Sequence, residues 1–345
     1  MKKELIQNTR ESEALKAELA EFLRQSDFAI VPVQGGASSR KYYTIEFSTP
    51  TYFPNQTILV MDAPLEDTAI LTNYMNVNYY LQRMAIPTPR LYEINLPHGW
   101  IFLEYVTAPT LEEYFHENPG QIDSVMPDLL SFICRMQKKC LYEDHCPAFQ
   151  RRFDFEKYMF EFNFHVREQL LGFYFHMEYD EALLKEFSHE ISRELDIEHA
   201  LFVHRDFQSS NLFIDAGNGR NEFVIIDFQD ARYGTPVYDI VSCLWDSYIP
   251  VSPDLREAMI KEYFQFLPEV GLNWDWDYYQ KIVDYTVIQR KLHDAGAFAY
   301  NYRRFGSKRY VRYIREAIEM AISCMVKYDN LAPVAKIFED LDRNV

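Results

Sequence analysis

The sequence lacks several features that mark particular classes of protein. No segment approaches ~18 consecutive apolar residues, so no transmembrane helix is expected. The N-terminal segment has no apolar core of the signal-peptide kind and is predicted to form an amphipathic helix, so we expect a cytoplasmic protein with no membrane partner. Basic residues number 35 against 52 acidic ones, and the net charge is −17. This charge disfavours a general nucleic-acid binder, because phosphate contacts require a basic face.

Cysteine is also scarce, with five residues in a chain of 345. An odd number of cysteines scattered along a long chain does not indicate a disulfide framework. Cys134, Cys140 and Cys146 recur every six residues, a spacing that matches no usual zinc motif. We therefore interpret them as ordinary thiols.

Strand and helix patterns occupy different parts of the chain. Candidate strands are found in FAIVPV (28–33), KYYTIEF (41–47), TILVMD (57–62) and WIFLEYVTAP (100–109). A helix is expected over roughly 66–84, and residues from about 110 to 200 are mainly helical. This segregation predicts an α+β fold with two lobes: a strand-rich part over 1–106, a connector near 103–108, and a mostly helical part over 107–345. Ligand sites favour clefts between such lobes.

Polar residues cluster where two short strand-like pieces, LFI and FVIID, interrupt the helical part. His204, Arg205 and Asp206 are followed after four residues by Asn211, the pattern H-R-D-x-x-x-x-N that kinases use in phosphoryl transfer. Asp227 follows Asp206 by 21 positions (227 − 206), at the end of the second apolar piece. The alternative is that these are chance tripeptides whose carboxylates form surface salt bridges.

The residue types suit the chemistry of a kinase, which positions the reacting groups and neutralises the charge on the transferred phosphoryl group. Mg²⁺ prefers oxygen ligands, which an amide at Asn211 and a carboxylate at Asp227 would supply. A separate carboxylate at Asp206 would accept a hydrogen bond from the attacking hydroxyl and act as the catalytic base.

Together with DFQDARYGTPVYDIVS, three further segments carry a family resemblance: GGASSRKYY, ILVMDAPLED and QRKLHDAGAF. Over roughly 28–315 the chain resembles the aminoglycoside phosphotransferase and choline kinase superfamily, small-molecule kinases that share the protein-kinase fold. Within it, the chain is most similar to bacterial amino-sugar kinases that phosphorylate the anomeric hydroxyl of N-acetylmuramate and N-acetylglucosamine. The resemblance implies a bilobal fold with a small β-rich N-lobe, ATP and Mg²⁺ as cofactors, a sugar as acceptor, and a role in cell-wall recycling.

The resemblance also implies where the nucleotide binds. The turn QGGASS would cover the ATP phosphates with backbone N–H groups, through Gly35, Gly36, Ser38 and Ser39. The connector LEYV would pair with adenine through its backbone, at Glu104 and Val106. Asp239, in PVYDIVS, is expected to be an N-cap or structural anchor for the next helix rather than a catalytic group.

One feature departs from the superfamily pattern. Most of its members carry a lysine on the third strand that grips the ATP phosphates, held by an acidic residue on the following helix. Here Met61 aligns with the lysine, and the stretch from Ala69 to Met84 contains no Asp or Glu. The lysine and its acidic partner are expected to be lost together, because a buried charge without its partner costs ~3–5 kcal/mol. Either Arg40 or Lys41 replaces the lysine, or the chain is a degraded kinase that acts as a nucleotide or sugar sensor.

The identity of the acceptor is less directly encoded. A carboxylate such as that of N-acetylmuramate would require a cation near the site, and Arg232 and Arg290 are candidates. For each arginine, the alternative is a surface ion pair. Arg205 and Asp230 are further candidates for acceptor contacts. An aminoglycoside would instead require acidic residues, and choline would require an aromatic cage.

Two further interpretations concern the C-terminal half. A protein kinase is disfavoured, because the chain has no A-P-E signature and little room for an activation loop after DFQD. The basic segment NYRRFGSKRYVRYIRE (301–316) is interpreted as a solvated helix pair balanced by nearby acidic residues, with a basic helix lining the acceptor site as the alternative.

Overall fold

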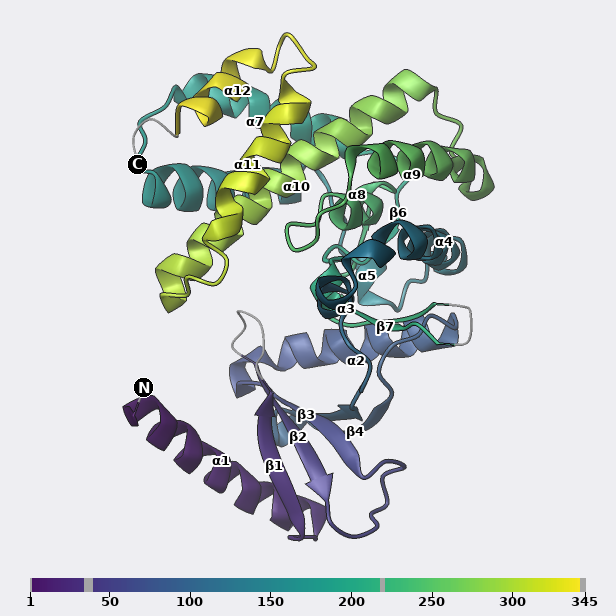
Figure 1. The fold of residues 1–345 in the computed structure, drawn as a ribbon, viewed down its shortest axis with the longest axis vertical. Coiled ribbons are helices and arrows are strands. Elements are labelled where there is room, and N and C mark those ends of the chain that lie inside the picture. The colour runs from purple at the N-terminus through teal and green to yellow at the C-terminus, as the bar shows by residue number, and fades with distance from the viewer. Residues whose placement is uncertain (1, 34–39, 218–220, 342–345) are drawn as a thin grey trace. The chain divides into compact units, whose positions relative to one another are not determined.

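The computed structural model describes residues 2–33, 40–217 and 221–341 (Figure 1). The chain forms two compact units. The first contains Met1–Tyr79 and Thr88–Thr107, and the second contains Tyr80–Pro87 and Ala108–Val345. The sheet in the first unit and the mostly helical remainder confirm the predicted α+β class.

The first unit is built on an antiparallel sheet with strand order β1-β2-β3-β5-β4. Its strands are β1 (Phe28–Val33), β2 (Lys41–Phe47), β3 (Thr57–Asp62), β4 (Leu91–Asn95) and β5 (Trp100–Glu104). Helix α1 (Lys2–Leu23) precedes the sheet, and η1 (Leu65–Asp67), α2 (Thr68–Arg83) and η2 (Leu96–His98) connect its strands.

The predicted amphipathic N-terminal helix is confirmed as α1. Leu15, Leu19 and Leu23 recur every four residues and therefore lie on one face of the helix. All three are buried in a cluster with strand residues that include Phe28 and Phe102. The sheet is therefore covered on this side by an apolar helix face that the sequence pattern already indicates.

Met61 lies inside the same sheet. It is fully buried and sits opposite Tyr42 of β2 and Ile101 of β5. The position that aligns with the superfamily's lysine is therefore part of the apolar core.

The second unit consists of helices around two short antiparallel strand pairs. Its helices are α3 (Leu111–Glu117), η3 (Pro119–Gln121), α4 (Ile122–Lys139), α5 (Pro147–Gln150), α6 (Phe155–Glu161), the π-helix η4 (Phe162–Tyr174), α7 (Glu181–Leu195), η5 (Ser209–Asn211), η6 (Phe228–Asp230), α8 (Tyr238–Leu244), α9 (Pro253–Phe266), η7 (Leu267–Val270), α10 (Trp276–Phe305), α11 (Arg312–Met325) and α12 (Ala332–Glu339). One strand pair joins β6 (Leu201–Val203) to β9 (Arg232–Gly234), and the other joins β7 (Leu212–Asp215) to β8 (Glu222–Ile225).

Helix α10 forms the centre of this unit and runs beside α11 (Figure 1). Gly296 lets it approach η4 closely, because a Cβ at this position would lie 2.1 Å from the carbonyl oxygen of His165. None of the helices in the described residues is both long enough and apolar enough to cross a membrane.

The basic segment at 301–316 contains the end of α10 and the start of α11, so the expected helix pair is present. Its arginines lie over aromatic rings: Arg309 is 5.2 Å from the Tyr310 centroid, and Arg312 is 4.5 Å from the Tyr313 centroid. The expected balance by acidic residues holds for Arg315, which forms an exposed ion pair with Glu319 at 3.0 Å.

Candidate functional site

The β7–β8 strand pair of the second unit brings the predicted metal ligands together. In the β7–β8 pair Leu212 lies opposite Ile225, and just beyond this pair the N–H of Ile226 donates to the carbonyl oxygen of Asn211 at 3.0 Å. Asn211 and Asp227 therefore sit at the same end of the hairpin, although 16 positions (227 − 211) separate them in sequence.

The loop from His204 to Asn211 (the catalytic loop) is fixed by its own polar groups. The His204 ring is buried, and its Nε2 atom lies 2.9 Å from the carbonyl oxygen of Ile226. The Asn211 side chain donates from Nδ2 to the carbonyl oxygen of Asp206 at 2.9 Å. Arg205 and Asp227 adopt left-handed backbone conformations, with φ of 79° and 63°. Such values are uncommon outside glycine and cluster at functional sites, where surrounding contacts hold them.

Asp239 holds the first residues of this loop in place. Its carboxylate accepts hydrogen bonds from the backbone N–H of His204 at 2.8 Å and of Arg205 at 3.0 Å. Burial raises the pKa of this carboxyl to about 7. The N-cap role expected from the sequence is wrong, because Val237 is the N-cap residue of α8 and Asp239 lies in the first turn. Asp239 is a structural anchor, but for the catalytic loop.

A second buried carboxylate, which sequence reasoning missed, holds the other end of the loop. Asp246 accepts from the N–H of Ser209 at 2.6 Å and of Tyr248 at 2.8 Å. The sequence pattern that could have indicated it is YDIVSCLWD, an apolar segment that ends in Asp246. A charged residue beside buried ones needs a partner.

The side chain of Asp206 is held by Arg290 of α10. One guanidinium nitrogen, Nη1, donates to Asp206 Oδ1 and to the carbonyl oxygen of Arg205, both at 3.1 Å. Arg290 in turn pairs through Nε with Asp294 Oδ1 at 3.1 Å. Burial alone would raise the pKa of the Asp206 carboxyl, but the guanidinium groups of Arg205 and Arg290 lower it below its usual value. Asp206 is therefore ionised at neutral pH and kept in one orientation.

Arg290 is itself only 2% exposed, so the alternative of a surface ion pair is wrong for this residue. Contact with the acceptor stays a prediction for Arg290, while its guanidinium already contacts Asp206, Asp294 and the hydroxyl of Tyr238. Arg205 pairs with Glu161 at 3.1 Å and with Asp230 at 3.4 Å.

The donor set at Asn211 and Asp227 fits Mg²⁺. The Asn211 amide uses its nitrogen within the loop, which leaves its oxygen as the remaining acceptor. Asp227 Oδ1 accepts from the Gln229 side chain at 2.7 Å, which orients the carboxylate. No cluster of three or more His, Cys, Asp or Glu residues in the described part of the chain is arranged to hold a metal. One amide and one carboxylate suit an ion that completes its shell with phosphate oxygens and water.

Four of the predicted nucleotide-binding residues, Gly35, Gly36, Ser38 and Ser39, lie outside the described residues. Lys41 begins β2, directly after Arg40. Glu104 ends β5, and its side chain accepts from the N–H of Arg90 at 3.1 Å; Val106 follows two positions later. These nucleotide assignments stay predictions.

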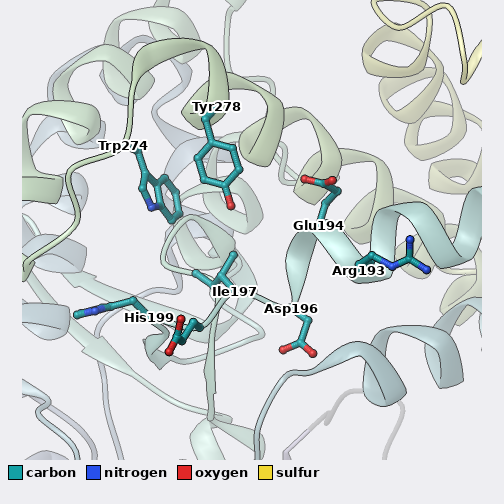
Figure 2. A pocket seen from close by; sticks show the side chains of 8 residues that line it. Arg193, Glu194, Asp196, Ile197, His199, Trp274 and Tyr278 are labelled. Atoms are coloured by element: carbon teal, nitrogen blue, oxygen red, sulfur yellow. The ribbon is translucent and has the colours of Figure 1, made fainter.

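A separate cavity of about 380 Å³ lies between the end of α7 and the start of α10 (Figure 2). The rings of Trp274 and Tyr278 lie near each other at 5.2 Å between centroids. Two of its carboxylates already have partners: Glu194 pairs with Lys281 at 3.1 Å, and Asp196 lies 3.4 Å from Arg152. No residue of the catalytic loop lines it, so we assign it no role.

Comparisons with known proteins show the family of the chain. A model of the phosphotransferase enzyme family matches residues 29–280. The N-acetylmuramate/N-acetylglucosamine kinase of Neisseria meningitidis serogroup B is 30% identical over 143 residues, which is 41% of this chain and 42% of that protein. The kinase of the same name from Pseudomonas aeruginosa is 22% identical over 324 residues, which is 90% of this chain and 88% of that protein.

Solved structures show the fold. Choline kinase LicA from Streptococcus pneumoniae matches with a TM-score of 0.61 at 12% identity and covers 91% of this chain and 99% of its own. The ADP-bound aminoglycoside phosphotransferase APH(2'')-Ib matches with a TM-score of 0.59 at 15% identity, over 88% and 96% of the two chains. The predicted bilobal kinase-like fold is therefore confirmed.

Proposed function

The chain belongs to the phosphotransferase enzyme family, and from this premise we propose that it transfers the γ-phosphoryl group of ATP to an N-acetylated amino sugar. Membership of the family confirms the predicted enzyme class, a small-molecule kinase. The proposed acceptor is the anomeric hydroxyl of N-acetylmuramate or N-acetylglucosamine, with Mg²⁺ as the metal. Both the acceptor and the metal go beyond what family membership establishes.

The observation that carries the proposal is the ionised, immobilised carboxylate of Asp206. Because Arg290 donates to its Oδ1, the remaining acceptor sites can receive a hydrogen bond from the attacking hydroxyl and orient it. A carboxylate with a lowered pKa is a weak base, so its contribution is chiefly alignment, with the proton accepted as the phosphoryl group transfers. Mg²⁺ at Asn211 and Asp227 would neutralise charge on the ATP phosphates.

The rest of the catalytic loop keeps this carboxylate in place. Asp239 and Asp246 hold two successive parts of the loop through backbone N–H groups, in addition to the contacts that the loop's own side chains make. Small misplacements of a catalytic group cost large factors in rate. These anchors therefore support an active enzyme over the alternative of a non-catalytic sensor.

The names of the relatives support the acceptor. The match with the Pseudomonas kinase extends over 88% of that protein's length, so it includes both the catalytic loop and the helical part that follows. The neighbours that act on choline or aminoglycosides share only 12–15% identity, which supports the fold and not their acceptors.

The test is ADP release from the purified chain with Mg·ATP, using N-acetylmuramate, N-acetylglucosamine, glucosamine, choline and kanamycin separately. We expect turnover with the two N-acetylated sugars alone. Turnover with choline or kanamycin instead would keep the phosphotransferase chemistry and reject the proposed acceptor. Tight ATP binding without turnover of any acceptor would favour the sensor.

The matched variant is Asp206→Asn, which keeps the size of the side chain and removes its charge. We expect kcat to fall by about 10²- to 10⁴-fold with little change in ATP affinity measured by calorimetry. Asp277→Asn, an exposed aspartate at the start of α10, serves as the control and should behave like the wild type. Full activity in Asp206→Asn would remove the assigned role.

A further inference from the structure

Beside the catalytic loop, the second unit gathers more positive than negative charge. The members of this cation cluster are Arg151, Lys157, Arg205 and Arg232. Two carboxylates, Glu161 and Asp230, lie among them. In a chain with a net charge of −17, four cations beside two carboxylates in one partly buried place require an explanation.

Three of the four cations share the two carboxylates. Glu161 is fully buried and lies between Lys157 at 3.0 Å and Arg205 at 3.1 Å. Asp230 lies 3.4 Å from both Arg205 and Arg151. Every carboxylate of the cluster therefore already has two cationic partners, and the fourth cation is left over.

That fourth cation is Arg232. It is half-buried, and its Nε is buried with no hydrogen-bond partner in the described part of the chain. Its strand, β9, places it opposite Val203, two residues before Arg205. Burial lowers the pKa of its guanidinium, and the positive charge of Arg205 lowers it further. A partly buried guanidinium without a carboxylate is costly to keep unless something anionic binds there.

We propose that Arg232, supported by Lys157, binds the carboxylate of an acidic acceptor and selects it over the neutral sugar. This inference rests on the proposed function and adds to it a preference for the acid, N-acetylmuramate, over N-acetylglucosamine. The guanidinium fork suits a carboxylate because it can donate two parallel hydrogen bonds. The location suits the acceptor, because Arg232 is paired to the strand that leads directly into the catalytic loop carrying Asp206.

The arrangement also explains why the cluster contains two carboxylates at all. Glu161, at the end of α6, also accepts a hydrogen bond from the Gln289 side chain of α10 at 2.8 Å. The Glu161 carboxylate is therefore held in place, and it in turn holds Arg205. Arg205 and Arg151 are thereby occupied as structural cations. Arg232 remains available for a ligand. Lys157 is paired with Glu161 but lies near enough to Arg232 for its positive charge to act at the same place.

The test compares two acceptors that differ by the carboxylate-bearing ether group. We expect Arg232→Gln to lower the ratio of kcat/KM for N-acetylmuramate to that for N-acetylglucosamine by about 10- to 100-fold, mainly through KM. Arg232→Lys keeps the charge and should recover part of the ratio. Arg135→Gln is the matched control, since Arg135 is another half-buried arginine, lying over the Phe132 ring, and its substitution should leave the ratio unchanged.

Binding measurements separate this inference from the proposed function. Calorimetric titration of N-acetylmuramate into the wild type and Arg232→Gln should show weaker binding by the variant, even if no acceptor is turned over. Equal binding by both proteins, or an equal loss for both sugars, would overturn the carboxylate site and leave the kinase assignment intact. A change in the KM for ATP alone would also overturn it.

Discussion

The carboxyl of Asp239 makes the stability of the folded chain depend on pH. It supports two backbone N–H groups of the catalytic loop, and its pKa in the folded chain is about 7 against an ordinary value of 3.8. Between these two values the folded chain holds a proton that the unfolded chain has released. The contribution of Asp239 to stability is therefore greatest in acid and is lost as pH rises through 7.

Asp239→Asn removes this titration. We expect the free energy of unfolding of the wild type, relative to the variant, to decrease by about 1 kcal/mol between pH 6 and pH 8. Urea denaturation of both proteins at the two pH values measures the difference. A constant difference would mean that Asp239 is already fully ionised at pH 6.

At the residue scale, local motifs are readable from the sequence and distant partners are not. The spacing of Asp206, Asn211 and Asp227 is fixed by one loop and one hairpin, so the pattern itself indicates their shared site. Arg290 contacts Asp206 across 84 residues, and Glu161 contacts Arg205 across 44. No spacing rule connects such pairs, because the packing of α6 and α10 against the loop determines them.

At the scale of elements, the close approach of α10 to η4 depends on Gly296. In an exposed helix, replacing glycine by alanine would stabilise the protein by ~1 kcal/mol. Here the new Cβ would lie 2.1 Å from a backbone oxygen, which cannot move aside as a side chain can. We therefore expect Gly296→Ala to destabilise the protein by about 1–3 kcal/mol or more.

The midpoint of urea denaturation measures this effect. Gly120→Ala is the matched control, because a Cβ at Gly120 meets nothing within 4 Å. Equal midpoints for Gly296→Ala and the wild type would show that η4 can shift to accept the methyl group.

Elements with strong patterns were predictable, and several others, among them β4 and η4, were not. The apolar runs of β1, β2, β3 and β5 indicate their strands directly. The strand β4 was missed, because it follows a proline-rich segment and its residues are only half-buried. The π-helix η4 could not be distinguished from an α-helix, because the sequence FDFEKYMFEFNFHVREQLLGFYF is apolar on several faces.

At the scale of the whole molecule, the cysteines predict how the folded chain responds to thiol reagents. All five are free, and four of them are buried. Burial raises the pKa of Cys134, Cys140 and Cys324 to about 12, so these thiols are protonated at neutral pH. Since the thiolate is the reactive form, we expect the folded protein to react slowly and all five thiols to react in urea. Colorimetric titration counts them, and rapid reaction of several thiols without urea would contradict the burial.

The division into two units has a consequence for how such a chain can be recombined. The chain passes from one unit to the other at three points, because Tyr80–Pro87 belongs to the second unit while the residues on both sides belong to the first. Within this short segment, the hydroxyl of Tyr80 donates to the carbonyl oxygen of Leu141, and the carbonyl oxygen of Pro87 accepts from the N–H of Ile225. A single genetic crossover near residue 107 would therefore join a catalytic unit from one parent to a segment 80–87 from the other. Chimeras that exchange acceptor specificity between related kinases should inherit 80–87 together with everything after residue 107.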